Sequence, residues 1–137
     1  MLRQAIGKGL GKRVGWVQAE AGKLPLADAS FDGVVCANSF HYFRRPEAAL
    51  AEVRRVLRPG GFFVIGDIKG YRHADAFTRM AGDWQVRHNG EPFWRETLTL
   101  DFVQEMREAG FAEVQDGPNP ADKLGGFPFL TVGRKAQ

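Results

Sequence analysis

The chain has 137 residues, of which 44% are apolar and 26% are charged, and its formal net charge is +3. This length predicts a single domain, and this composition excludes collagen-like, mucin-like and wholly disordered proteins. Cys36 is the one cysteine, so no intrachain disulfide can form, and no cluster of Cys and His has metal-ligand spacing. The longest apolar runs, such as residues 62–65, fall far short of the ~20 residues that span a membrane. We therefore expect a cytoplasmic protein with no metal site and no membrane partner.

The excess of positive charge is concentrated in residues 1–23, where basic side chains outnumber the single acidic one, Glu20. A mild positive charge of this kind favours solubility and does not by itself identify a partner. No nucleic-acid recognition motif accompanies it, so we do not expect nucleic acid to be the partner.

Short β-rich runs alternate with helical patterns along the chain, which indicates an α/β fold. The first predicted element is a short helix in residues 1–12, interrupted by glycines. Residues 14–19 contain valines and a tryptophan and predict a strand, and a loop follows at 22–30. Residues 31–37 form a short apolar run with almost no alternation, which is typical of a central strand covered on both faces of a parallel sheet.

The next helix is predicted by both its first residue and its apolar spacing. Pro46 suits the first turn, where its missing N–H has no partner to lose, and apolar residues then recur every three or four positions. The sequence Pro59-Gly60-Gly61 should end this helix and lead into a buried strand at residues 62–67. On the side of this helix that faces solvent, we expect three basic side chains: Arg54, Arg55 and Arg58.

The end of the chain predicts a helix and two strands. Thr97 or Thr99 can cap a helix that carries Phe102, Val103 and Met106 on one face and ends at Gly110. The closing strands, which we expect to be antiparallel, are residues 111–115 and 127–132.

A glycine-rich stretch near the start resembles a nucleotide-binding loop in composition only. Residues 7–11 read G-K-G-L-G, but such a loop must follow a strand and open a helix. Here only residues 1–6 precede the glycines, and the predicted strand at 14–19 follows with no helix between. We therefore interpret these glycines as a loosened helix that leads into the next element.

Three motifs in order carry a family resemblance. They are L-P-L-A-D-A-S-F-D at residues 24–32, C-A-N-S-F-H at 36–41 and V-L-R-P-G-G at 56–61. The chain resembles the class I S-adenosylmethionine-dependent methyltransferases, in particular the group with an LPF-x-D-x-SFD stretch and an L-[KR]-P-G-G turn. The resemblance is clear over residues 14–68 and looser beyond, and it identifies no substrate.

The resemblance implies a partial Rossmann-like methyltransferase fold. A mainly parallel sheet would be flanked by helices and finished by an antiparallel C-terminal strand pair. The family begins with a strand, a glycine-rich loop, a helix and a second strand, but residues 7–24 are too few for such a βαβ unit. We therefore expect residues 1–137 to be a single methyltransferase domain that lacks its first βαβ unit.

The resemblance also implies S-adenosylmethionine as methyl donor, with binding residues on two loops. Glu20 and Ala21 occupy the place of the family's Asp-Ala, so Glu20 would accept a hydrogen bond from the adenine amino group. Alternatively, Glu20 is a solvated loop carboxylate. Asn38 and Ser39 leave the predicted central strand where the family lines its donor pocket, although they could equally cap the following turn.

The acceptor side of the site would follow directly. In the cleft, a neutral His41 could take a proton from the acceptor as the methyl group is transferred, although in-line transfer does not always need a base. Tyr42 could orient the acceptor or simply pack. Tyr71 and Trp84 lie in an aromatic-rich stretch that could cover the acceptor or form core.

These features predict an S-adenosylmethionine-dependent methyltransferase acting on a small molecule, with an incomplete donor site that leaves the activity of this chain alone open. The alternative is a non-catalytic remnant of the fold that binds a partner. Without the first unit, the strands at 14–19 and 31–37 would have unpaired edges, which are templates for association. Either these two strands pair directly, or a second copy completes the sheet, and we expect a homodimer.

Overall fold

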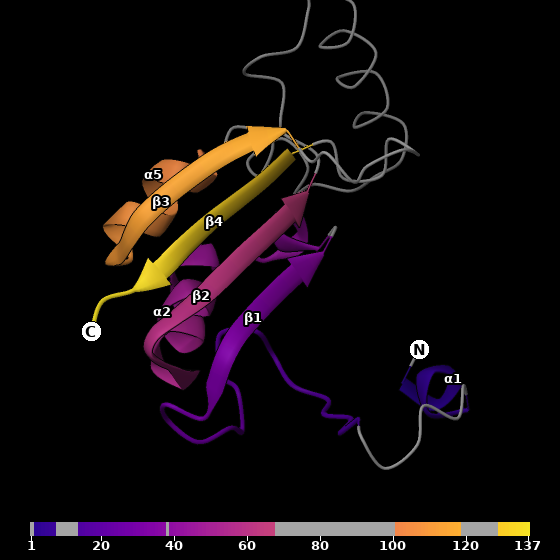
Figure 1. Cartoon of the computed structure of the whole chain (residues 1–137). Helices are drawn as coiled ribbons and strands as arrows, with labels where there is room; N and C mark the ends of the chain where they lie inside the picture. Colours follow the sequence, from indigo (N-terminus) through magenta and orange to yellow (C-terminus); the bar gives the residue numbers. More distant parts are fainter. Residues whose placement is uncertain (1, 8–13, 38, 68–100, 119–128) are drawn as a thin grey trace, which may run out of the picture.

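The computed structural model describes residues 2–7, 14–37, 39–67, 101–118 and 129–137. Its strands form one sheet in the order β1-β2-β4-β3 (Figure 1). The pair β1 and β2 is parallel, whereas β4 is antiparallel to both of its neighbours. The expected α/β architecture with an antiparallel C-terminal pair is therefore confirmed. The elements are α1 (Leu2–Ile6), β1 (Phe31–Ala37), the 3₁₀ helix η2 (Phe40–Tyr42), α2 (Pro46–Val56), β2 (Leu57–Asp67), α5 (Phe102–Glu108), β3 (Phe111–Pro118) and β4 (Phe129–Lys135).

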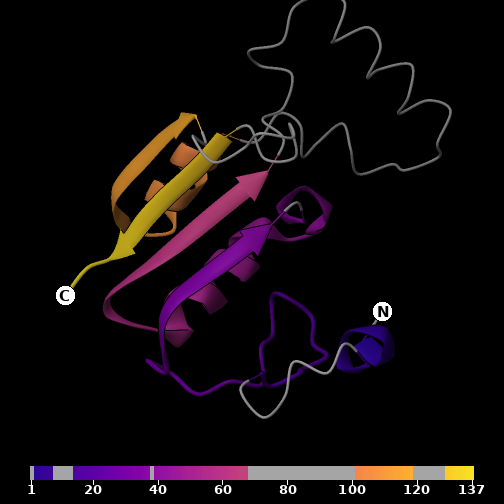
Figure 2. The same cartoon turned by 45° about the vertical axis from the view of Figure 1, so that its right-hand side comes forward.

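The core lies between the sheet and the two helices α2 and α5, which cover the same face (Figures 1 and 2). Phe63 and Ile65 of β2 are buried on that face, whereas Phe62 is exposed, as the alternation of side chains along a strand requires. The ring of Phe40 packs edge-on against that of Phe102, with centroids 5.5 Å apart, and so joins η2 to α5. The other core side chains are Cys36, Leu50, Val53, Leu57, Met106 and Phe111.

Helix α2 confirms the prediction made from Pro46 and the apolar spacing. Pro46 stands in its first turn, and its apolar side chains are buried. The chain then passes into β2 at Leu57, so the strand begins before Pro59 rather than at residue 62 as predicted. Gly60 takes a φ of +77°, and a Cβ on Gly61 would lie 2.9 Å from a backbone oxygen, so both positions need glycine.

Two predictions about the first half of the chain are wrong. Residues 14–19 form no strand; they are exposed, and they pair with no described strand that could complete a ladder. The strand at Phe31–Ala37 has the predicted bounds but lies at an edge of the described sheet instead of its centre. Its Val35 is 67% exposed, so it is not covered on both faces by described residues.

Helix α5 agrees with the prediction at its C-terminus but not at its N-terminus. Its N-cap is Asp101, whose carboxylate accepts hydrogen bonds from the N–H groups of Val103 and Gln104, both at 3.2 Å. The expected caps, Thr97 and Thr99, lie outside the described residues. Gly110, with a φ of +83°, follows the helix as predicted. No helix in the described part of the chain is long and apolar enough to cross a membrane.

The Asp101 cap gives a direct test of this helix end. Asp101→Ala should lower the free energy of unfolding by about 1 kcal/mol, because two N–H groups of the first turn lose their acceptor. Urea denaturation followed by circular dichroism measures the change. Asp101→Asn is the matched control and should retain most of the stability, since asparagine caps as well as aspartate. Equal losses in both variants would contradict the capping role.

Candidate functional site

Arg55 and Glu52 of helix α2 hold the loop that precedes β1 through charged hydrogen bonds. We call this set of contacts the clamp. Arg55 donates from Nε and Nη2 to the two carboxylate oxygens of Glu52, at 2.7 and 2.8 Å. It also donates to the backbone oxygens of Leu24 and Leu26, at 3.0 and 2.8 Å, and to the Asp28 carboxylate. Glu52 in turn accepts from the Leu24 N–H at 2.7 Å. Arg55, predicted on the solvated side of the helix, is partly exposed, but its guanidinium is engaged by the loop and by Glu52.

The clamp depends on both partners being charged. Hydrogen bonds from Arg55 and from the Leu24 N–H lower the pKa of Glu52 from 4.5 to about 2. The same contacts, first with Glu52 and then with Asp28, raise the pKa of Arg55. Arg58, for which a solvated position is also predicted, pairs with Asp32 of β1 at 2.6 Å. Two of the three predicted surface arginines thus tie α2 and β2 to the motif at residues 24–32.

The carboxyl end of β1 leads into η2, where several predicted site residues lie. Ser39 Oγ lies 3.2 Å from Cys36 Sγ, so this hydroxyl interacts with the end of β1. His41 is only 4% exposed, and its ring lies 4.0 Å from that of Tyr42, measured between centroids. Tyr42 itself is exposed. Asn38 lies outside the described residues, as do the predicted acceptor-side residues Tyr71 and Trp84.

The structure brings Glu20, Ala21 and Tyr42 together around a pocket of about 270 Å³. One wall is residues 19–22. The other is the stretch from Tyr42 to Arg45, which ends immediately before α2. Glu20 Oε1 accepts a hydrogen bond from Arg45 Nη2 at 3.3 Å, and both side chains are largely exposed. Neither Ser39 nor His41 lines this pocket.

Arg45 is the residue that the sequence analysis missed. It stands 25 positions from Glu20, and only the basic pair Arg44-Arg45 ahead of Pro46 could have drawn attention to it. Chemically, the pocket offers an exposed carboxylate beside apolar Ala19, Ala21 and Phe43. Such a carboxylate can accept a hydrogen bond from the amino group of a bound heterocycle.

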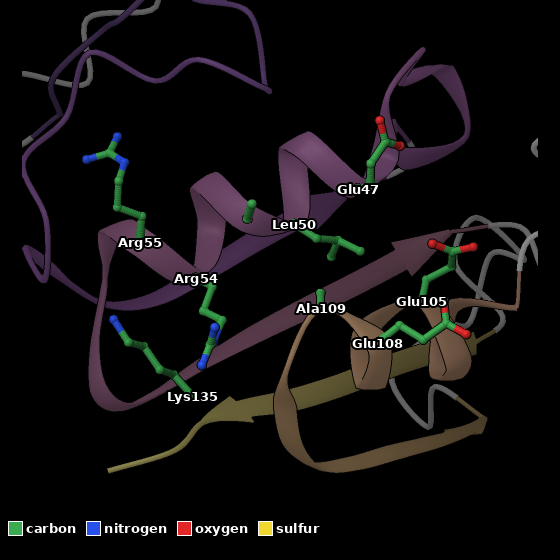
Figure 3. Close-up of a pocket in the computed structure, with 9 residues that line it drawn as sticks. Glu47, Leu50, Arg54, Arg55, Glu105, Glu108, Ala109 and Lys135 are labelled. Atoms are coloured by element: carbon green, nitrogen blue, oxygen red, sulfur yellow. The ribbon is translucent and has the colours of Figure 1, made fainter.

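A larger groove of about 610 Å³ lies between α2 and α5, and none of the predicted site residues lines it (Figure 3). Glu47, Glu105 and Glu108 lie toward one end, and Arg54 and Lys135 lie toward the other. Burial, and then the negative charges of Glu108, Glu47 and Asp101, raise the pKa of Glu105. Lys135 Nζ donates to the Leu57 backbone oxygen at 2.7 Å, so part of the basic end has a structural role.

The comparisons with known proteins agree on one family. A family profile described as "Methyltransferase domain" matches residues 1–65. A ubiquinone/menaquinone biosynthesis C-methyltransferase of Methylobacterium nodulans is 34% identical over 128 residues, which cover 82% of this chain and 51% of that protein. A probable phthiotriol/phenolphthiotriol dimycocerosates methyltransferase of Mycobacterium ulcerans is 46% identical over 76 residues, covering 53% of this chain and 30% of that protein. The chain therefore spans about half the length of the first relative and less than a third of the second.

Solved structures show the same fold at lower sequence identity. A SAM-dependent methyltransferase of Thermotoga maritima superimposes with a TM-score of 0.63 at 23% identity, covering 87% of this chain and 63% of that one. A SAM-dependent methyltransferase of Methanosarcina mazei gives a TM-score of 0.65 at 18% identity, covering 98% and 77%. The expected Rossmann-like methyltransferase fold is therefore confirmed.

The clamp predicts an acid-dependent loss of stability. Glu52→Gln should lower the melting temperature by several degrees above pH 5, because Arg55 loses one of its two carboxylate partners and keeps only Asp28. A carboxyl whose pKa is lowered on folding stabilises the protein above its unfolded pKa and stops doing so as the pH falls through its folded value. The difference between wild type and Glu52→Gln should therefore shrink between pH 4.5 and about 2.

Melting curves recorded by circular dichroism from pH 2.5 to 7 measure this difference. Glu113→Gln is the matched control, since Glu113 is exposed on β3 and pairs only at 3.4 Å with Arg134. A difference between wild type and Glu52→Gln that stays constant from pH 5 to pH 2.5 would contradict the clamp.

Proposed function

Because the chain belongs to the class I S-adenosylmethionine-dependent methyltransferases, whose methyl donor is S-adenosylmethionine, we propose that it binds this donor beside β1 and methylates a small molecule. The observation that carries the proposal is the pocket in which Glu20 and Ala21 face the segment that follows β1. Parallel α/β sheets bind ligands outside the carboxyl ends of their strands, and η2 continues the chain from that end of β1.

The pocket fits the adenine end of the donor. Its volume of about 270 Å³ lies at the lower end of ligand pockets, which suits one heterocycle better than a whole nucleoside with its amino-acid tail. Glu20 supplies the acceptor for the adenine amino group, and Ala21 and Phe43 supply apolar walls. An exposed ion pair is weak, so Glu20 can exchange part of its contact with Arg45 for a contact with the base.

The acceptor side rests on Tyr42 and His41. Bound donor supplies an electrophilic methyl group, and the acceptor atom that takes it must lose a proton if it carries one. Tyr42 is exposed and lines the pocket, and it is the candidate for orienting the acceptor. His41 is the candidate base; it is buried, its ring lies 4.0 Å from that of Tyr42 between centroids, and it does not line the pocket. Ser39 holds the end of β1 through Cys36.

Donor binding is the first test. Isothermal titration of the purified chain with S-adenosylhomocysteine, which retains the adenosine and lacks the reactive methyl group, should show micromolar binding. Glu20→Ala should weaken the affinity by about tenfold or more, because the adenine amino group loses its charged acceptor. Glu113→Gln, on the far edge of the sheet, should leave it unchanged. No heat at millimolar ligand would overturn the proposed function of this chain.

We also propose that the chain is a cytoplasmic homodimer that associates through the free edge of β1. The one cysteine of the chain, Cys36, is buried and forms no disulfide, which suits a reducing compartment. No described strand pairs with the outer edge of β1, and such an edge is a template for association.

Size-exclusion chromatography with light scattering should give twice the monomer mass of 15.2 kDa at tens of micromolar chain. The buried area would come from apolar side chains at the β1 edge, so the dimer should persist at high salt. A stable monomer at that concentration would contradict this proposal.

A further inference from the structure

Arg45 stands at a position where local helix rules disfavour an arginine. It is the N-cap residue of α2, where serine, threonine, aspartate or asparagine commonly supplies an oxygen to the first N–H groups. The Arg45 side chain makes no such capping hydrogen bond, and its charge meets the positive end of the helix dipole. Residues that break a local rule are expected at functional sites. The role of this guanidinium therefore lies outside its own helix.

The Arg45 guanidinium reaches the opposite wall of the pocket proposed for the donor. Its Nη2 donates to Glu20 Oε1 at 3.3 Å, and the same nitrogen would lie 3.9 Å from a Cβ added to Gly22. The walls approach so closely there that this added Cβ would lie 3.1 Å from the Cβ of Ala48. The Arg45 backbone is fixed as well, because its carbonyl oxygen accepts from the Ala49 N–H at 3.2 Å. The guanidinium thus lies beside Glu20 in a pocket that both residues line.

The contact leaves both groups able to bind a ligand. A carboxylate has two oxygens and a guanidinium has five N–H donors. Within the described part of the chain, the Glu20 and Arg45 side chains make one hydrogen bond, the one that joins them. The two side chains are 70% and 62% exposed, so a ligand in the pocket can reach both. The pocket therefore offers an acceptor oxygen and a donor nitrogen side by side.

Adenine presents the matching pair of groups. Its amino group donates, and the ring nitrogens on either side of it, N1 and N7, accept. An asparagine or glutamine amide binds adenine in this way, with its oxygen on the amino group and its nitrogen on N7. Glu20 and Arg45 offer the same acceptor and donor from two side chains, and their charges strengthen both hydrogen bonds.

We propose that Arg45 is a specificity-determining residue of the donor pocket, and that its guanidinium donates to the adenine nitrogen, N1 or N7, beside the amino group that Glu20 binds. This inference rests on the donor binding proposed above and adds a second contact to the base. Glu20 alone can accept from any amino group that enters the pocket. Glu20 together with Arg45 requires an amino group next to a ring acceptor, as in adenine.

The alternative is that Arg45 only fastens residues 20–22 to α2. Arg58 makes a similar exposed ion pair with Asp32, which joins β2 to β1 away from the pocket. A purely structural Arg45 would affect all ligands of the pocket alike, whatever atoms their bases carry. The two roles therefore differ in how the affinity depends on the ring nitrogens.

A cycle of two variants and three ligands tests the contact. Isothermal titration measures the affinity of wild type and Arg45→Ala for S-adenosylhomocysteine and for its 1-deaza and 7-deaza analogues, in which a C–H group replaces N1 or N7. One analogue should bind wild type about tenfold more weakly than S-adenosylhomocysteine, because Arg45 loses its acceptor. Arg45→Ala should bind S-adenosylhomocysteine about tenfold more weakly than wild type does and should no longer distinguish that analogue from it.

Arg58→Ala is the matched control, since it removes an arginine from an exposed ion pair that does not line the pocket. It should keep the wild-type affinities for all three ligands. Arg45→Met removes the guanidinium and keeps most of the length of the side chain. It replaces Arg45→Ala in the cycle if thermal melting shows that the alanine variant is not folded.

The outcomes separate this inference from the proposed function. If wild type binds S-adenosylhomocysteine and Glu20→Ala weakens the binding, donor binding stands. Equal wild-type affinity for all three ligands would then overturn the role of Arg45, and so would an analogue that loses as much affinity in Arg45→Ala as in wild type. An unchanged affinity of Arg45→Ala for S-adenosylhomocysteine would overturn it too. If wild type binds no S-adenosylhomocysteine, donor binding and this inference fail together.

Discussion

The contact between Arg55 and Glu52 is the constraint on which the placement of the first half of the chain depends. One guanidinium satisfies a carboxylate on its own helix, two backbone oxygens and the Asp28 carboxylate of the loop. Two further hydrogen bonds continue the attachment, from the Ala29 N–H to Arg55 O at 3.0 Å and from the Ser30 N–H to Val56 O at 2.8 Å. The chain therefore enters β1 at a fixed point beside the end of α2.

This attachment gives the family motif a structural explanation. In the stretch L-P-L-A-D-A-S-F-D, the backbone of Leu24 and Leu26 and the carboxylate of Asp28 all bind Arg55, and Asp32 binds Arg58. The helix side of the same contacts is a Glu and an Arg three residues apart, which face each other on one side of a helix. In this chain the motif fastens the loop to α2 and β2, a structural role that needs no contact with a ligand.

The sequence predicted those elements whose signals are local. The helix at Pro46 and the strand at Phe31–Ala37 were found because a proline, an apolar spacing and an apolar run each act within a few residues. Asp101 was missed as a cap because two threonines stand just ahead of it. The strand expected at 14–19 failed for a different reason, since strand propensity cannot replace a neighbour that accepts the ladder.

The candidate site was predicted only in part, for the same physical reason. Family likeness placed Glu20 and Ala21 on one side and Tyr42 on the other, and the pocket does bring these three together. The contact between Glu20 and Arg45 depends on how the chain folds back over 25 residues, which no local pattern specifies. His41 could act on the acceptor only from within the cleft, but in the structure it is 4% exposed and does not line the pocket.

The two walls of the pocket are therefore held in different ways. The stretch from Tyr42 to Arg45 is held between the core contact of η2 and the first turn of α2. Glu20 is held on its C-terminal side by the turn to Lys23 and the clamp, and on its N-terminal side it continues into residues 14–19, which are exposed and have no regular secondary structure. Glu20 therefore owes its position to the turn that closes on Lys23 and to its contact with Arg45, whereas the opposite wall is fixed by the core contact of Phe40 with Phe102. A change in the turn should act on the pocket through Glu20 without disturbing the opposite wall.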